Sequence, residues 1–204
     1  MFPLAHTYVA EKYFGELNKN IRLGSIAPDI LAALPNFSFP ETHETKFKNF
    51  NSESFEKAWN LHNKFDEFFH TPKYCYNLIP KTIKKDFGKN LGHLYIESAY
   101  DLLLYNDGIY YSFPKMTKKM KTNLEKYFGK NLVLEKTTEY FEHWTEKTYP
   151  KFLTRNMWFF ATRQKHILTY DQINENIKLC TDNIQNKLGD YKLVFKEFLK
   201  KDKL

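Results

Sequence analysis

Three side chains that can bind metal recur at every fourth position in the stretch AWNLHNKFDEFFHTP: His62, Asp66 and His70. On an α-helix, residues i and i+4 lie on one face about 6 Å apart, so His62 and Asp66 can hold one ion together. His62 and His70 are about 12 Å apart along the helix axis, which is too far for one ion with bonds near 2 Å. If His70 is a ligand, it therefore serves a second ion, and Asp66 lies between the two.

A second pair with the same spacing, His93 and Glu97, occurs in GHLYIE. A helix that carries His62 must stop before Pro72, because proline disfavours helical backbone in the residue before it. His70 should then close that helix and turn outward, toward a pair such as His93 and Glu97. The sequence therefore predicts that His93 and Glu97 form the other side of the metal site.

Three more candidate ligands precede these pairs, namely His6, Asp29 and His43. We expect them in the opening turn of a helix, at a helix start beside Pro28, and in a loop. Nitrogen and carboxylate ligands suit zinc, or manganese if the set is richer in oxygen. Any one histidine–acid pair at this spacing is more typical of a solvated helix face. The metal hypothesis depends on the ordered set His6, Asp29, His43, His62, Asp66, His70, His93 and Glu97.

This ordered set resembles the zinc-dependent phospholipase C and single-strand zinc nuclease superfamily, which includes bacterial phospholipase C/D-domain proteins. The stretch LGSIAPDI also looks like the segment that carries the aspartate in bacterial members. The resemblance covers roughly residues 1–105. It implies an all-helical fold, a cluster of two or three zinc ions, and hydrolysis of a phosphate ester.

The resemblance also implies which residues share an ion. One zinc would take Asp29, His43, His62 and Asp66, and a second would take His70, His93 and Glu97. A third would take His6, a shared Asp66 and the N-terminal amine, here that of Met1. Asp66, as a bridge between ions, and Asp29 are the expected catalytic residues. Asp101, one turn beyond Glu97, is expected to support a ligand histidine or to serve as a third acid.

A second resemblance competes with the first. MFPLAHTYVA looks like the opening of acyl carrier protein phosphodiesterase, which removes phosphopantetheine from its carrier. That family also has a helical His-x-x-x-Asp segment, and a later acidic pair that Glu97 and Asp101 in ESAYDLLL would match. Chain length and the lack of a signal peptide favour this alternative, whereas His43, His70 and His93 favour the zinc enzymes.

The elements that must position these residues are expected to be helices. The 204 residues include only 7 Gly and 8 Pro, which are too few turn-forming residues for a protein of many strands. We predict an all-α, single-domain multi-helix bundle with the metal site between helices. Residues 1–105 would carry the ligands and residues 115–204 would support them. The best helix patterns cover 52–70 and 90–106; residues 36–50 should be a loop, and further helices are expected at 73–89, 115–128, 131–146, 150–165 and 170–200. Gly189 should break the last of these.

The composition excludes some functions. The net charge of +7 comes from lysines spread along the chain without an arginine-rich stripe, so we expect no stable nucleic-acid complex. The sequence has no apolar run long enough to span a membrane and no signal-like start, so we expect a cytoplasmic protein. Its partner would be a phosphate-ester substrate: a phospholipid, a nucleotide or a phosphopantetheine carrier. The alternative of another class is a non-catalytic basic helical binding protein whose histidines are structural.

Overall fold

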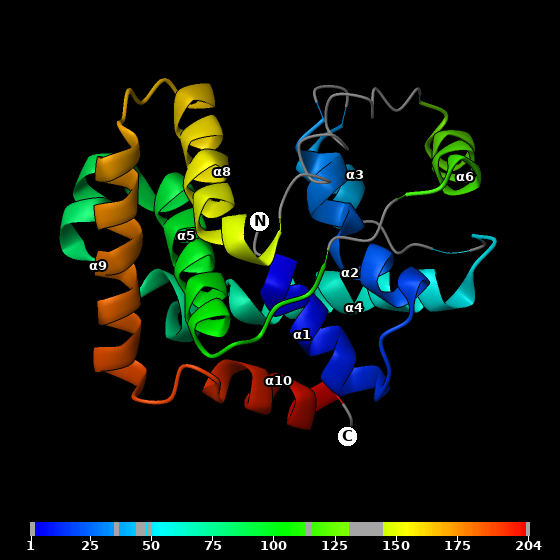
Figure 1. The fold of residues 1–204 in the computed structure, drawn as a ribbon, viewed down its shortest axis with the longest axis horizontal. Helices are drawn as coiled ribbons and strands as arrows, with labels where there is room; N and C mark the ends of the chain where they lie inside the picture. Colours follow the sequence, from blue (N-terminus) through cyan, green and yellow to red (C-terminus); the bar gives the residue numbers. More distant parts are fainter. Residues whose placement is uncertain are drawn as a thin grey trace. The chain divides into compact units, whose positions relative to one another are not determined.

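The computed structural model describes residues 3–34, 37–43, 48, 50–112, 116–130 and 145–202. Within these ranges the chain forms helices and turns and no strand, which confirms the all-α class (Figure 1). No helix in the same ranges is long and apolar enough to cross a membrane. The α-helices are α1 (Pro3–Phe14), α2 (Lys19–Ala32), α3 (Phe39–His43), α4 (Glu53–Phe69), α5 (Lys81–Asn106), α6 (Lys118–Phe128), α8 (Tyr149–Arg163), α9 (Tyr170–Leu188) and α10 (Leu193–Asp202).

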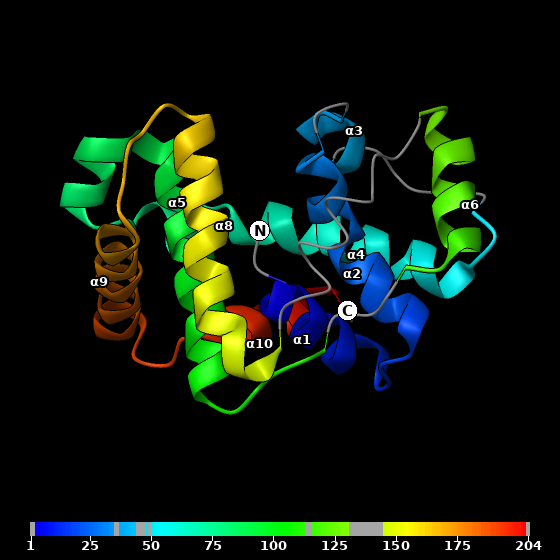
Figure 2. The ribbon, with the colours of Figure 1, turned by 45° about the horizontal axis from the view of Figure 1, so that its top comes forward.

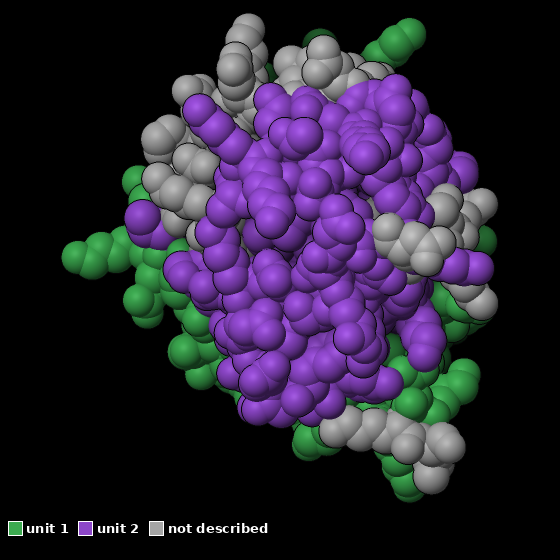
Figure 3. Space-filling model, turned by 90° about the vertical axis from the view of Figure 1, so that its right-hand side faces the viewer, with its two compact units in different colours: residues 1–5, 66–110, 146–204 green, residues 6–65, 111–145 purple. Residues whose placement is uncertain are grey.

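The chain divides into two compact units, coloured separately in Figure 3. Unit 1 contains residues 1–5, 66–110 and 146–204, and unit 2 contains residues 6–65 and 111–145. This division differs from the expected ligand half and supporting half, because each unit combines early and late segments. Helices α1 and α4 each contribute residues to both units, and α4 carries His62 in unit 2 and Asp66 in unit 1.

Unit 2 is built around a close approach of α2 to α4. A Cβ atom added at Gly24 would lie 2.4 Å from the carbonyl oxygen of Phe55 and 2.9 Å from the Cβ of Ala58. Only glycine fits between these helices without moving the backbone. The apolar core of this unit is completed by buried residues of α2, α4, α6 and the intervening turns: Leu23, Ala27, Leu31, Leu34, Phe37, Phe50, Phe55, Trp59, Met120 and Leu124.

The expectation that Pro28 and Asp29 begin a helix is wrong. Helix α2 begins ten residues earlier at Lys19 and continues through Pro28. Its start is set by Asn18, whose side chain accepts hydrogen bonds from the amides of Asn20 and Ile21. Proline in a helix interior removes one backbone hydrogen bond. Here the surrounding buried residues of α2 retain the helix, so Asp29 projects from its third turn.

The expected loop at 36–50 contains a short helix, α3, which ends at His43. Glu41 stabilises its start, because its carboxylate accepts hydrogen bonds from the amide and hydroxyl of Ser38 at 2.8 Å. Pro40 does not prevent this helix, because proline fits a first helical turn. Helix α3 packs on α2 and thereby brings His43 toward Asp29.

Unit 1 is a group of helices in which α5 packs against both α8 and α9, and α8 packs against α9 (Figures 1 and 2). The expected helices at 52–70, 90–106 and 150–165 are present as α4, the second part of α5, and α8. Residues 73–89 instead form a short π-helical turn, Pro72–Tyr76, followed by the first turns of α5, which bends at Gly88. The predicted helix at 170–200 is divided at Gly189, and the one at 131–146 lies almost entirely outside the described residues.

Asp101 fixes the start of α1 from a distant position in the chain. Its two carboxylate oxygens accept hydrogen bonds from the backbone amides of Leu4, at 3.2 Å, and Ala5, at 2.9 Å. The Tyr149 hydroxyl also donates to it. An acid at a helix N-terminus satisfies amides that have no partner within the helix and complements the helix dipole. Asp101 thus positions the helix that carries His6 in its next turn.

Replacing Gly24 with alanine should destabilise the protein. The added methyl group would collide with the backbone of α4, so we expect a loss of about 1–3 kcal/mol in the free energy of unfolding, despite alanine's higher helix propensity. Gly92→Ala is a matched control in α5, because there the new Cβ meets only side-chain atoms of Ile79, at 3.0 Å and beyond. Chemical denaturation of both variants is the measurement. Equal stability of the two would contradict the proposed close approach.

Asp101 should make stability depend on pH. Burial raises the pKa of Asp101 to about 7, against the opposing hydrogen bonds from Tyr149 and Ala5. Between its unfolded pKa of about 4 and this folded value, the folded chain holds a proton that the unfolded chain has lost. The stabilisation is complete below about pH 4 and is lost, by about 4 kcal/mol, as the pH rises through about 7. Urea denaturation from pH 4 to 8 should show a flatter profile for Asp101→Asn, and parallel profiles would exclude this explanation.

Candidate metal centre

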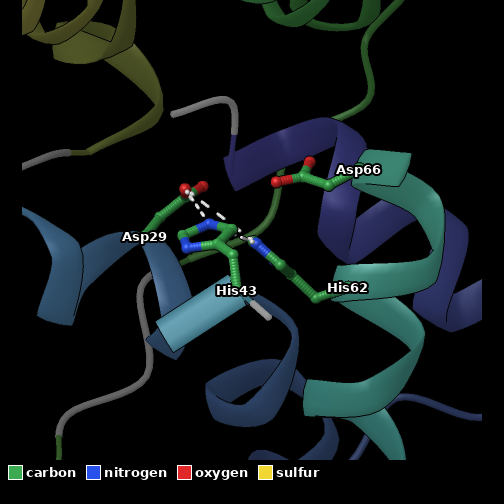
Figure 4. A group of neighbouring side chains, drawn as sticks. All are labelled: Asp29, His43, His62 and Asp66. Atoms are coloured by element: carbon green, nitrogen blue, oxygen red, sulfur yellow. Dashed lines mark hydrogen bonds and ion pairs between the residues drawn. The ribbon is translucent and has the colours of Figure 1, made fainter. Parts of the chain in front are cut away.

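Four candidate ligands form cluster A, defined here as Asp29, His43, His62 and Asp66. Asp29 projects from α2 and His43 from the end of α3, whereas His62 and Asp66 lie one turn apart on α4 (Figure 4). One donor atom from each side chain lies within 4.8 Å of the others. The histidines and Asp66 are buried, and the Asp29 side chain is 12% exposed. The four side chains point toward one another, as a common ion would require.

Two donor spacings in cluster A, both made by His43, match those of a tetrahedral metal site. The Nε2 atoms of His43 and His62 are 3.3 Å apart, and Nε2 of His43 is 3.3 Å from Oδ1 of Asp29. Two donors on one tetrahedral zinc, with bonds of about 2.0–2.1 Å, lie about 3.3–3.4 Å apart. Nε2 of His62 is 4.0 Å from the same Asp29 oxygen, so a small side-chain adjustment would complete the geometry.

Hydrogen bonds at the other ring nitrogens orient both histidines. Nδ1 of His62 donates to the Ser25 carbonyl at 2.7 Å, which leaves Nε2 as its acceptor. The Thr42 hydroxyl lies 2.7 Å from Nδ1 of His43 and donates to the Phe39 carbonyl, so it accepts the His43 proton. When both rings are neutral, two Nε2 lone pairs therefore face each other across cluster A, and a proton taken up on Nε2 of His43 makes the hydrogen bond to Asp29. Facing lone pairs are favourable when a cation lies between them, and outer hydrogen bonds of this kind are usual for metal-bound histidine.

The electrostatics of cluster A favour a bound cation. Burial alone would raise the pKa of Asp29, but the nearby His62 and the hydrogen bond with His43 lower it well below its usual range. Its Oδ2 atom is buried and accepts no hydrogen bond within the described part of the chain. An ionised carboxylate taken out of water needs a compensating charge or hydrogen bonds. Asp29 is therefore held as a carboxylate ready to accept positive charge.

His6 lies beside cluster A rather than within it. Its ring stacks on that of His62, with centroids 3.6 Å apart and planes inclined by 17°. Its Nε2 is 3.8 Å from Oδ2 of Asp29, too long for a hydrogen bond. The predicted third ion would need His6, Asp66 and Met1, and Met1 lies outside the described residues. The structure thus places His6 next to the expected ligands, and the predicted third set, which includes Met1, lies partly outside the described residues.

The other three candidates form cluster B, defined as His70, His93 and Glu97. His70 lies just past the end of α4, as predicted, and its Nε2 is 2.8 Å from Oε1 of Glu97. Nε2 of His93 is 3.9 Å from the same oxygen, and its Nδ1 donates to the carbonyl of Lys89 one turn earlier in α5. Two histidines and one glutamate form a three-ligand set that leaves a coordination position open for water, as in catalytic zinc sites.

The charges of cluster B are tightly linked. Burial would raise the pKa of Glu97, but the hydrogen bond from His70 and the interaction with both neighbouring histidine rings lower it to about 2. Burial would lower the pKa of His70, yet the bond to Glu97 and the nearby Asp66 raise it overall. Burial lowers the pKa of His93 and keeps that ring neutral, as a metal ligand must be. An ion entering cluster B would displace the proton of His70.

Several residues that support the clusters were missed in the sequence. Ser25 and Lys89 act through backbone carbonyls, which no residue type reveals. Thr42 is adjacent to His43, and a hydroxyl beside a candidate ligand is only a weak signal. Phe39 is 52% exposed and stacks on His43, with centroids 4.0 Å apart. The predicted role of Asp101 beside a ligand differs from its observed bonds, which go to α1 and Tyr149.

The clusters should bind metal independently. Chelator-treated protein given zinc should retain two ions per chain, whereas His62→Ala and His93→Ala should each retain one, because each loses a ligand of a different cluster. His166→Ala is the matched control, since His166 lies outside both sets. Zinc at a hundredfold excess over its Kd should raise the free energy of unfolding by about 2.7 kcal/mol per site. Absence of bound metal, with unchanged melting in chelator, would contradict both sites.

Comparison with known proteins identified no relative of this chain. No family model matches the chain, and neither a curated protein nor a solved structure matches it. The candidate metal centre therefore rests on the positions of the protein's own side chains.

Proposed function

We propose that the protein is a metal-dependent phosphodiesterase that cleaves a phosphate ester with a metal-activated water. The observation that carries the proposal is the pairing of a four-donor cluster A with a three-donor cluster B in one chain. Zinc fits both sets, with manganese as the alternative in the more oxygen-rich cluster A. A bound ion of this kind would lower the pKa of a coordinated water and offset negative charge on the phosphate.

Some residues of the chain would hold the ions, and others would control the protonation of the site. Asp29 and Asp66 are the acids of cluster A, and we propose that they take part directly in catalysis. Asp66 also contributes to the field that raises the pKa of His70 in cluster B. Its charge therefore reaches cluster B, its donor atom groups with cluster A, and we propose on this basis that it bridges the two ions. Glu97, held ionised at a pKa of about 2, would supply the negative charge of cluster B at physiological pH.

The observed contacts favour a zinc phospholipase or nuclease type of enzyme over acyl carrier protein phosphodiesterase. His43, His70 and His93 are used only by the former resemblance, and all three lie in the two clusters. The latter requires Glu97 and Asp101 to act as an acidic pair. Asp101 instead accepts hydrogen bonds from Leu4, Ala5 and Tyr149, so its oxygens are already engaged.

Hydrolysis of bis(p-nitrophenyl) phosphate tests the proposal directly. We expect zinc-dependent activity that chelator removes, and a fall in kcat/KM of about 100-fold or more in His62→Ala and Asp66→Asn. Asp86→Asn is the control, because Asp86 is an exposed acid of α5 outside both clusters. Full activity in the Asp66→Asn enzyme with metal bound would exclude the role assigned to that acid.

The natural ester can then be identified by comparing substrates. Phosphatidylcholine, a dinucleotide and phosphopantetheinylated carrier protein each present a different leaving group to the same centre. Release of the unmodified carrier would support acyl carrier protein phosphodiesterase instead. Metal binding without hydrolysis of any of the three would favour the non-catalytic binding protein.

A further inference from the structure

The hairpin formed by α8 and α9 exposes a group of large apolar side chains at its connecting end. This hairpin patch consists of Trp158 and Phe159 of α8, Ile167 of the turn, and Tyr170 at the start of α9. Ile167 is 99% exposed and the other three are 40–52% exposed. The rings of Trp158 and Tyr170 meet edge to face at 6.2 Å, so these two residues of the patch contact each other across the two helices. Figures 1 and 2 show the two helices joined by this turn.

The same segment is strongly basic. Residues 147–170 contain three lysines and two arginines and no aspartate or glutamate, and the exposed acids Glu146 and Asp171 border this segment on either side. Arg155, Arg163 and Lys165 are exposed along α8 and the turn, among the apolar side chains. A surface that combines exposed aromatic and aliphatic groups with unbalanced positive charge is suited to an apolar layer bordered by negative charge.

The turn holds Ile167 outward at an energetic cost. Lys165 has φ = 65°, the left-handed conformation in which glycine is preferred, and it is the only non-glycine residue with positive φ in the described ranges. The amides of Lys165 and His166 bond to the carbonyls of Thr162 and Ala161, which closes α8. The ring of His166 packs on Phe87 of α5 at 5.2 Å, so the turn is tied to unit 1 while the next residue projects into solvent.

We propose that the hairpin patch docks the protein on anionic phospholipid membranes. Ile167 would enter the acyl boundary, Trp158 and Tyr170 would lie at the headgroup level, and the basic side chains would face lipid phosphates. An aliphatic side chain neither stacks on a base nor bonds to a phosphate, so nucleic acid would leave Ile167 exposed. A second copy would place one basic patch against another. This inference does not depend on the proposed hydrolase activity.

Vesicle sedimentation tests the proposal with the full chain. We expect binding to vesicles of equal parts phosphatidylglycerol and phosphatidylcholine, little binding to phosphatidylcholine alone, and weaker binding at high salt. Ile167→Ser should reduce partitioning about tenfold, and the double variant Arg163→Glu, Lys165→Glu should reduce it at least about tenfold. The controls are Leu179→Ser, a 42% exposed apolar residue of α9, and the equally charged double variant Lys178→Glu, Lys200→Glu.

Tryptophan fluorescence identifies the inserted surface. The experiment uses a Trp144→Phe background, so that Trp59 and Trp158 are the only tryptophans left. Brominated lipid should quench the emission of the bound protein, and adding Trp158→Phe should remove most of that quenching, because Trp59 is buried. Four results would overturn the proposal: no binding to anionic vesicles, equal losses in the hairpin and control variants, tighter binding to single-stranded DNA than to vesicles, or a dimer in solution that Ile167→Ser dissociates. Each can be observed whether or not the protein hydrolyses a phosphate ester.

Discussion

The contact of α2 with α4 at Gly24 is the constraint that organises unit 2. The hydrogen bond from His62 to the Ser25 carbonyl depends on this contact. Any side chain at residue 24 would push the helices apart, because the space is filled by the backbone oxygen of Phe55. At this separation the next residue, Ser25, presents its carbonyl 2.7 Å from Nδ1 of His62. That bond fixes the ring so that Nε2 faces His43 and Asp29. The geometry of cluster A therefore follows from the absence of one Cβ atom.

The second general feature is the burial of negative charge among neutral or weakly basic rings. Asp29, Asp66 and Glu97 are largely removed from water, and their partners are mainly histidines. An arginine or lysine would neutralise such acids permanently. A histidine can release its proton and bind a cation with the same nitrogen. The folded chain thus holds ionised carboxylates that a divalent ion can neutralise. This property is the physical basis for proposing a metal enzyme.

The hairpin patch differs from the two clusters, because it exposes large apolar side chains that most proteins bury. Scattered exposed apolar side chains are normal in soluble proteins. Here a fully exposed isoleucine follows a lysine held in a left-handed turn, within a segment that lacks any acid. The folded core of unit 1 does not require this combination, because the buried faces of α8 and α9 already contact α5. A surface with affinity for anionic lipid accounts for the exposure, the charge and the turn together.

The sequence by itself determined the helical class, the course of α4, the position of His70 past its end, and the identity of all seven residues in the two clusters. Helical spacing is a local property, so the separation of His62 from His70 could be calculated before the fold was known. Only the tertiary structure decided that Asp29 projects from inside a long helix, that His43 ends a short one, and that Asp101 caps α1 from another helix. These depend on which backbones can approach one another, and on carbonyl groups that every residue shares, so no pattern of side-chain types predicts them.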